Sequence, residues 1–267
     1  MAILTISREY GAGGRDIGRL VAERLHYEYV DKEKLFRDLD AAGGRWGRVA
    51  REVDEVCPTL WERHDWQYRG YVARLEALIL EYAARDRVVL IGRGSNILLK
   101  DVPFCLKVRL VAPLEVRIER IMVRDSLDRE AAARLIHQVD HERQCYITAT
   151  YGRTWEDEKL YDLILNTGTL TFAGTADLLI RELQQKDALA TPEARAHLQD
   201  LALAATLKAK LATDPRLFIP TLEVHWEGDT LVVAGIIHTP KEKLLVEELS
   251  RQAAGTRPLR FALHYRG

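Results

Sequence analysis

The feature that most constrains this chain is a run of small residues, Gly11–Gly14, between a short apolar segment and an amphipathic helix. The preceding segment, Ile3–Ser7, has the apolar composition and length of a buried parallel strand. In the following segment, Asp16–Leu25, apolar residues recur at helical spacing. Glycines placed here let the backbone approach a phosphate closely, and the helix N-terminus directs free N–H groups at the anion. The predicted phosphate-binding residues are Gly11, Ala12, Gly13, Gly14, Arg15 and Asp16.

Short apolar segments alternate with helical ones through the first two thirds of the chain. The further strand candidates are His26–Val30, Val88–Ile91, Cys105–Val111 and Leu163–Leu165. Helices are expected over Leu127–Ala149, over Thr171–Leu183 and over most of Lys32–Asp86, where a glycine-bearing break at 43–47 divides the pattern. Alternating strands and helices indicate parallel βαβ units. We therefore expect an α/β fold with a doubly wound, parallel, five-stranded sheet that binds ligands at the carboxyl ends of its strands.

The pattern changes after Gln185. The stretch Lys186–Thr191 is expected to be a linker, and a helix is expected to begin at Pro192. Two alternating segments then meet across Glu227–Asp229, as in a hairpin, and a helix and a last strand follow them. This α-β-β-α-β order does not continue the first sheet. We therefore expect two domains, residues 1–187 and residues 192–267.

Charge and cysteine content narrow the possible functions. A net charge of −1 and a pI near 6.7 argue against a general nucleic-acid binder, which needs a basic excess. The cysteines, Cys57, Cys105 and Cys145, are far apart, which predicts free thiols rather than a zinc site or a disulfide framework. The N-terminal apolar run is too short for a signal peptide, and no stretch is long enough for a transmembrane segment. These features predict a cytoplasmic protein.

The glycine loop departs from the usual pattern of a P-loop. In that pattern a lysine reaches the outer phosphates, and a Ser or Thr hydroxyl meets magnesium. This chain has Gly14 at the lysine position, followed by Arg15 and Asp16. In one interpretation Arg15 or Arg8 supplies the missing positive charge, because guanidinium binds phosphate oxygens well. In the other the loop is a tight turn, or it binds nucleotide without catalysis.

Four segments, in order, resemble the cytidylate kinase-like family of nucleoside-monophosphate kinases. The most specific is LTISREYGAGGRDIG, at the N-terminus. The second, VVLIGRGSNIL, is similar to a segment that carries Gly-Arg-Asp in cytidylate kinases, with Gly94 in place of the acid. The others resemble the approach to the kinase lid, VRLVAPLEVRIERIMVRD, and the lid with the final strand, VDHERQCYITATYGRTWEDEKLYDLILNTGTLT. The resemblance implies a P-loop kinase domain with a helical lid.

The resemblance also implies a reaction. Such kinases transfer the terminal phosphoryl group of ATP to a nucleoside monophosphate, here with CMP or dCMP favoured, and they use Mg²⁺. Because charge spreads over the transferred group, the enzyme acts by positioning and by electrostatic stabilisation, which requires converging arginines. The implied catalytic residues are Arg15, Arg93 and Arg143, with Arg124 and Arg143 contributed by the lid. The implied acceptor site contains Asp31, Arg93 and Asp140, and Asp16 would hold magnesium through water.

Each of these assignments has a structural alternative, which is hardest to apply to Arg93. The arginines Arg117, Arg120 and Arg124 fit a solvated helix face, Asp140 and Arg143 fit a pair along a helix, and Asp16 suits a helix N-terminus. By contrast, Arg93 follows a buried strand in a Gly-Arg-Gly turn, where an anion is the natural partner of its charge. His137 and His141 lie four apart without a third ligand, so no zinc site is expected.

The C-terminal region resembles a BON domain over LEVHWEGDTLVVAGIIHTPKEKLLVEELSRQAAGTRPLRFALHYR. That family is associated with binding to membranes or other ligands, which implies a ligand or protein partner for residues 192–267 and no catalytic residue. An alternative function for the whole chain follows. It would be a non-catalytic nucleotide sensor that signals through the BON-like domain.

Overall fold

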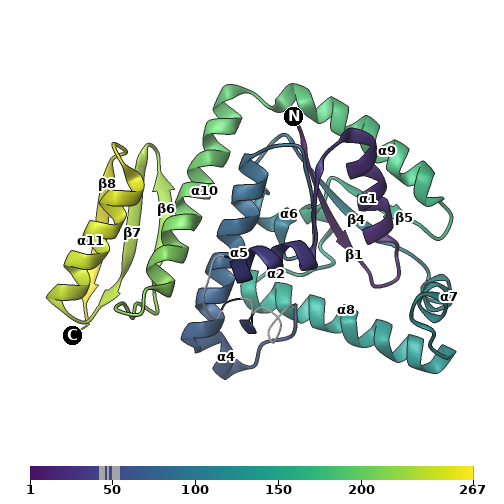
Figure 1. Cartoon of the computed structure of the whole chain (residues 1–267), viewed down its shortest axis with the longest axis horizontal. Coiled ribbons are helices and arrows are strands. Elements are labelled where there is room, and N and C mark those ends of the chain that lie inside the picture. The colour runs from purple at the N-terminus through teal and green to yellow at the C-terminus, as the bar shows by residue number, and fades with distance from the viewer. Residues whose placement is uncertain (42–45, 47, 50–54, 267) are drawn as a thin grey trace.

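The computed structural model describes residues 1–41, 46, 48–49 and 55–266 (Figure 1). A parallel sheet with strand order β2-β3-β1-β4-β5 forms the centre of its larger part. The strands are β1 (Ile3–Arg8), β2 (Glu28–Val30), β3 (Val88–Ile91), β4 (Cys105–Val111) and β5 (Leu163–Asn166). The predicted doubly wound α/β fold is confirmed. The predicted break at 43–47 lies outside the described residues, apart from Trp46.

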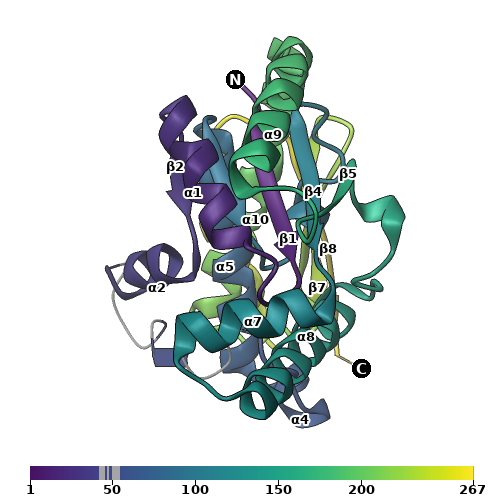
Figure 2. The ribbon, with the colours of Figure 1, turned by 90° about the vertical axis from the view of Figure 1, so that its right-hand side faces the viewer.

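Side chains of the sheet alternate between two apolar cores on its two faces. Leu4 and Ile6 of β1 pack toward α1 (Gly14–Leu25) and α9 (Phe172–Lys186). Ile3 packs on the opposite face, where the covering helices are α2 (Lys32–Ala41) and α5 (Trp66–Ala84). Figure 2 shows α1 and α9 in front of the sheet and α5 behind it. The period-two pattern of a strand buried on both faces explains why these segments are apolar throughout.

Helices α7 (Leu114–Asp125) and α8 (Arg129–Tyr151) pack together next to the carboxyl ends of the strands (Figure 2). Their contact is apolar and includes Ile118, Ile121 and Ile136. This helix pair lies where the helical lid is expected. Further short elements of this part are α4 (Leu60–His64), α6 (Ser95–Leu98) and the 3-10 helix η1 (Glu158–Leu160).

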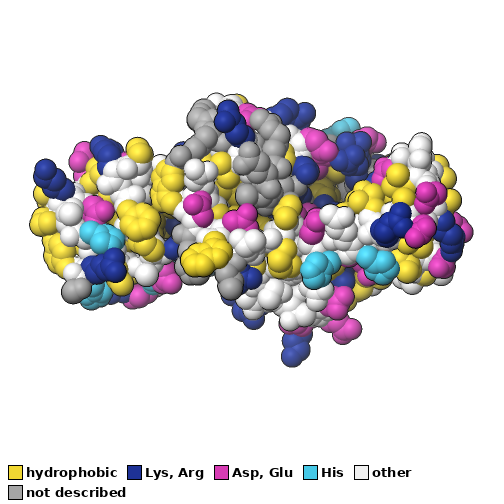
Figure 3. All heavy atoms as spheres, turned by 90° about the horizontal axis from the view of Figure 1, so that it is seen from below, with side chains coloured by type: hydrophobic (Ala, Val, Ile, Leu, Met, Phe, Trp, Pro, Cys, Tyr) yellow, Lys and Arg dark blue, Asp and Glu magenta, His cyan; other side chains and the backbone are white. Residues whose placement is uncertain are grey.

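The C-terminal part has its own three-stranded sheet, in the order β6-β7-β8. Its elements are α10 (Pro192–Thr213), β6 (Glu223–Glu227), β7 (Thr230–Ile237), α11 (Pro240–Ala254) and β8 (Leu259–Tyr265). Strands β6 and β7 are antiparallel, whereas β7 and β8 are parallel. This is the expected α-β-β-α-β order. Figure 3 shows an elongated molecule whose lower face mixes acidic and basic side chains.

Helix α10 belongs to both parts of the molecule. Leu198 and Ala202, in its first half, are buried in the core that contains α5, while Leu207 and Leu211 are buried in the C-terminal core. In Figure 1 α10 lies alongside α5. The stretch expected to be a linker instead contains the last residue of α9 and the 3-10 helix η2 (Asp187–Leu189). Within the described ranges, no helix has the length and apolar character needed to span a membrane.

The prediction that all three cysteines are free thiols is wrong. Cys57 and Cys145 form a disulfide, with their Cα atoms 5.0 Å apart. They are 88 positions apart in the sequence, so only the packing of α8 against the segment before α4 brings them together. Cys105 is a free thiol buried in β4, and burial raises its pKa to about 12.

Candidate functional site

The glycine loop joins β1 to α1 with two residues in the left-handed region, Gly11 at φ +86° and Gly13 at φ +80°. Gly13 caps α1 without a side-chain hydrogen bond, so the first N–H groups of this helix have neither a side-chain cap nor an intrahelical partner. A Cβ atom at Gly13 would lie 2.4 Å from the ring of Phe172, and one at Gly14 would lie 2.8 Å from Cγ of Arg8. The glycines are therefore required by close packing as well as by φ. The uncapped N-terminus suits an anion.

This N-terminus borders a cavity of about 850 Å³ at the carboxyl ends of β1, β2 and β3. The volume falls within the range of cofactor and small-molecule pockets. Its lining is rich in charge. The arginines are Arg8, Arg15, Arg93, Arg120, Arg124 and Arg143, and the acidic residues are Glu9, Asp16, Asp31, Glu33, Glu55, Asp125 and Glu142.

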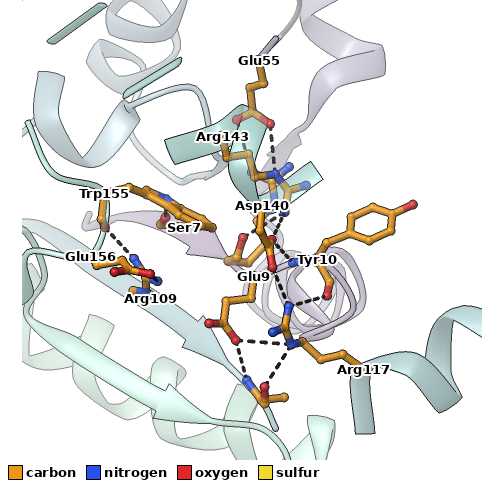
Figure 4. A network of polar contacts seen from close by, with 12 residues as sticks. Ser7, Glu9, Tyr10, Glu55, Arg109, Arg117, Asp140, Arg143, Trp155 and Glu156 are labelled. Carbon is orange, nitrogen blue, oxygen red and sulfur yellow. Dashed lines mark hydrogen bonds and ion pairs between the residues drawn. The ribbon is translucent and has the colours of Figure 1, made fainter. Parts of the chain in front are cut away.

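Three of these arginines converge on Glu55. Its Oε1 accepts a hydrogen bond from the backbone N–H of Arg93 at 2.9 Å and lies 3.4 Å from Nη1 of Arg8. Its Oε2 lies 3.4 Å from Nε of Arg143 and 3.7 Å from Nη1 of Arg93. Burial raises the pKa of the Glu55 carboxyl, but the charges of the three arginines outweigh it and hold the pKa well below its usual range. Figure 4 shows the Glu55 carboxylate facing Arg143.

Sequence reasoning did not identify Glu55. It stands in a segment with no periodic pattern and no motif, so nothing in the sequence distinguishes it from an exposed glutamate. Arg8 was considered only as a substitute for the P-loop lysine. The structure places it as the last residue of β1, with its stem against Gly14 and its side chain 15% exposed.

The turn after β3 has three consecutive residues with positive φ: Gly92 at +74°, Arg93 at +55° and Gly94 at +69°. A Cβ atom at Gly92 would lie 2.1 Å from Nη1 of Arg8, and one at Gly94 would lie 2.3 Å from the ring of Tyr151. The Tyr151 hydroxyl donates to the carbonyl of Arg93 at 3.2 Å. The turn holds Arg93 at 2% exposure beside Glu55. The glycine at position 94 thus provides the space that Tyr151 fills.

Asp140 of α8 lies beneath the loop. Its carboxylate accepts from the backbone N–H of Tyr10 at 2.8 Å and from Nη1 of Arg117 at 2.5 Å (Figure 4). Asp140 does not line the cavity, whereas Arg143, one turn later, does. Arg143 pairs with Asp140 at 3.8 Å and donates to the carbonyl of Arg8 at 3.0 Å. Burial, together with the charge of Arg8, lowers the pKa of Arg143 to about 10, so it remains a cation at neutral pH.

Arg15 and Arg124 occupy the edge of the cavity. Nη2 of Arg15 lies 2.6 Å from Oε1 of Glu33, and both side chains are more than half exposed. Arg124 lies over the ring of Tyr10, 4.8 Å from its centroid, and donates to the tyrosine hydroxyl. It also pairs with Asp125. Both arginines therefore lie at the cavity, although neither joins the cluster around Glu55.

The acidic candidates are separated. Asp16 is exposed in the first turn of α1 and lines the cavity. Asp31 is buried at the end of β2, where its carboxylate accepts from the N–H of Lys34 at 3.1 Å. Burial, followed by a hydrogen bond with Glu33, raises the pKa of Asp31. Among the described residues, no group of three or more His, Cys, Asp or Glu side chains is arranged to hold a metal ion.

Arg120 has a structural role that its helical spacing did not show. It donates to the carbonyl of Gly11 at 3.3 Å and to the carbonyl of Thr167 at 2.7 Å. Its guanidinium lies 4.9 Å from the centroid of Phe172. Arg120 thus joins the glycine loop to the segment after β5. The solvated helix face considered for this residue does not describe it, because it is tied to three other elements.

This fold and site define a P-loop kinase-like protein, in which a glycine loop and an uncapped helix meet converging arginines at the carboxyl edge of a parallel sheet. The profile of the cytidylate kinase-like family matches residues 3–169, more than half of the chain. The chain belongs to that family.

Individual relatives cover different shares of the chain. The chain is 32% identical over 147 residues to uronate isomerase of Corynebacterium glutamicum, over 55% of this chain, and it spans only 28% of that protein's length. It is 26% identical over 180 residues to cytidylate kinase of Methanocaldococcus jannaschii, over 66% of this chain and 94% of that enzyme. An uncharacterized protein from Eubacterium ventriosum has a similar fold, with a TM-score of 0.55 and 21% identity, over 69% of this chain and 99% of that one.

Proposed function

We propose that this protein transfers the γ-phosphoryl group of ATP to a nucleoside monophosphate or a similar small acceptor, with CMP or dCMP favoured. The observation that carries the proposal is the uncapped N-terminus of α1, which opens on a cavity lined by arginines from separate elements. Membership of the cytidylate kinase-like family supports a nucleotide substrate. The need for cytosolic ATP supports a cytoplasmic location.

The chemistry of the transfer accounts for the arginines. The bond between the γ-phosphorus and the β–γ bridging oxygen breaks, and a bond forms to an oxygen of the acceptor. Charge spreads over the transferred group, so fixed cations contribute most of the stabilisation. Arg93, Arg143 and Arg124 border the cavity from the β3 turn, α8 and α7, and they are suited to this role. Mg²⁺ bound to the phosphates would neutralise further charge, and we assign Asp16, an exposed carboxylate that lines the cavity, to hold it through water.

The missing lysine requires another cation near the loop, and Arg8 and Arg15 are the two candidates. The stem of Arg8 lies against Gly14, and its mostly buried guanidinium lies beside Glu55 in the lining of the cavity, which supports it as the substitute. Arg15 is next in the chain but lies at the edge of the cavity in an exposed pair with Glu33. We therefore assign Arg8 the larger contribution and keep Arg15 as the alternative.

The acceptor side of the site contains Asp31 and Arg93 in this proposal. Both follow strands of the sheet and line the same cavity. Asp140 was expected there as well. Its position beneath the loop supports an indirect role, in which it holds the N–H of Tyr10 and orients Arg143.

A non-catalytic nucleotide sensor is the second candidate. Two observations favour it: Gly14 replaces the lysine, and the Glu55 carboxylate already pairs with three of the arginines at the cavity. The C-terminal part, which we propose to be a BON-like module with its own ligand or protein partner, would report nucleotide binding. Helix α10, buried in both cores, would connect the two parts.

Phosphoryl-transfer assays with ATP, Mg²⁺ and a panel of nucleoside monophosphates test the proposal. We expect turnover of CMP or dCMP that falls at least a hundredfold in Arg93→Ala, because this arginine is buried at the cavity. Arg251→Ala, which removes an exposed arginine of α11, is the matched control and should leave the rate unchanged. ATP binding without transfer to any acceptor would favour the sensor. If neither ATP nor GTP binds at millimolar concentration, the loop is not a nucleotide site.

A further inference from the structure

Glu55 occupies the position of an anionic ligand within the site. Its carboxylate receives a backbone N–H and three guanidinium groups, as the phosphate of an acceptor would. The proposed function assigns phosphate binding to all three of these arginines, with Arg8 as the substitute for the P-loop lysine. A ligand phosphate and the Glu55 carboxylate therefore require the same donors.

The disulfide holds the chain next to Glu55 against the helix that carries one of these arginines. Cys57 lies two residues after Glu55, and its partner Cys145 lies two residues after Arg143 on α8. Two residues of extended chain span at most roughly 7 Å. While the bond is intact, Glu55 thus cannot move far from Arg143.

We propose that Glu55 is an internal competitor for the acceptor's phosphate, held in place by the Cys57–Cys145 disulfide, so that reduction of this bond opens the anion site. The inference rests on the proposed function of that site. Tethering explains why competition is effective, because a short tether gives a group an effective concentration of about millimolar. An acceptor at lower concentration competes poorly until the disulfide is reduced or the Glu55 carboxylate is removed.

The redox step requires a dithiol reductant, and both cysteines are partly exposed to solvent. One thiolate of the reductant attacks Sγ of a cysteine, the protein S–S bond breaks, and a mixed disulfide forms. The second thiol of the reductant then displaces the protein sulfur and forms a disulfide within the reductant. The reductant supplies two electrons and two protons, and the protein gains two thiols.

Isothermal titration of the full chain with inorganic pyrophosphate, and separately with CMP, tests the proposal before and after reduction with dithiothreitol. We expect the Kd of the wild type to fall at least tenfold on reduction. Glu55→Gln should bind tightly when oxidised and should no longer respond to reductant. Cys57→Ser should bind as tightly as the reduced wild type without reductant. Cys105→Ala, which alters the free cysteine, should respond as the wild type does.

Several outcomes overturn the inference, and they differ from failure of the proposed function. Equal Kd values for oxidised and reduced wild type, or no gain in Glu55→Gln, would show that Glu55 does not compete. Should Glu55→Gln not fold, the response of Cys57→Ser and of the wild type to reductant decides the matter. If CMP is phosphorylated with the same KM in both redox states, the inference fails while the function stands. If pyrophosphate binding responds as expected but no acceptor is phosphorylated, the kinase function fails, while competition between Glu55 and a phosphate ligand stands.

Discussion

At the residue scale, the cluster around Glu55 is an arrangement of opposed charges with little access to solvent. Arg8, Arg93 and Arg143 carry like charges at one site, and the carboxylate offsets their mutual repulsion. Removal of one partner from a buried ion pair is costly because the remaining charge is left without compensation. The cluster therefore links stability to occupancy of the anion site, since a bound phosphate supplies the same compensation.

Glu55→Gln should lower the free energy of unfolding at pH 7 by about 3 kcal/mol. The pKa of Glu55 is depressed in the folded protein, so its contribution is present above the unfolded pKa and is lost as pH falls toward the folded value. The difference between wild type and variant should therefore be constant from pH 6 to 8 and shrink below about pH 4. Urea denaturation across this range measures it, and a difference that grows on acidification would contradict the assigned charge state.

Arg8→Ala should reduce kcat/KM for phosphoryl transfer about a hundredfold, whereas Arg15→Ala should reduce it less than about tenfold. The reason is that Arg8 lies against Gly14 with little exposure, while Arg15 forms an exposed pair with Glu33. Arg8→Lys is the control and should recover part of the activity, because a lysine normally acts at this loop. Steady-state kinetics of the variants decide between Arg8 and Arg15 as the substitute for the P-loop lysine. A larger loss in Arg15→Ala than in Arg8→Ala would identify Arg15 as that cation.

At the scale of elements, the two glycine turns have different constraints. The loop before α1 leaves its N–H groups free for an anion, whereas the turn after β3 uses three positive φ angles to hold Arg93 beside Glu55. In both turns a neighbouring side chain occupies the place of a Cβ atom. Glycine is therefore required in both turns for two reasons, the close packing and the backbone conformation.

Gly94→Ala should destabilise the protein by about 1–2 kcal/mol for its positive φ, plus about 1–3 kcal/mol because the new Cβ would clash with Tyr151. Gly152→Ala is the matched control, since Gly152 has φ +62° and no atom near the place of its Cβ. Thermal denaturation of both variants measures their stability, and the difference between the two losses is the cost of the clash with Tyr151. Equal losses would mean that Tyr151 moves aside without cost.

Element boundaries were predictable where periodicity was strong. The strands β3 and β4 occupy the predicted ranges, Val88–Ile91 and Cys105–Val111. These segments have a single pattern bounded by glycine, proline or charge. The stretch before α10 was predicted to be a linker, because the short helical turn η2 has no period long enough to detect.

At the scale of the whole molecule, α10 joins the two parts more closely than a domain boundary at residue 192 suggests. Its first half completes the core around α5, and its second half completes the C-terminal core. Ala73 and Ala77 of α5 pack against Ala209 of α10, where small side chains allow the helices to approach. The predicted boundary therefore separates α10 from α5, although the first half of α10 packs in the core around α5.

A chain ending at residue 190 should be less stable than one ending at residue 213, because only the longer chain retains Leu198 and Ala202 in the first core. Burial of a leucine side chain contributes roughly 1.5–3 kcal/mol, so the difference in Tm should be several degrees. Differential scanning calorimetry measures both chains. An equal Tm would show that residues 1–190 fold independently of α10.

The sequence by itself determined the architecture: the alternating strands and helices, the glycine loop before α1 and the second small sheet. These features follow from local periodicity and from the backbone freedom of glycine, which depend on neighbours in the chain. Only the tertiary structure decided that Cys57 pairs with Cys145, that Glu55 lies among three arginines, and that the stem of Arg8 lies against Gly14 while Arg15 forms an exposed pair with Glu33. Such contacts join segments tens of residues apart, and distances between distant segments leave no periodic trace in a sequence.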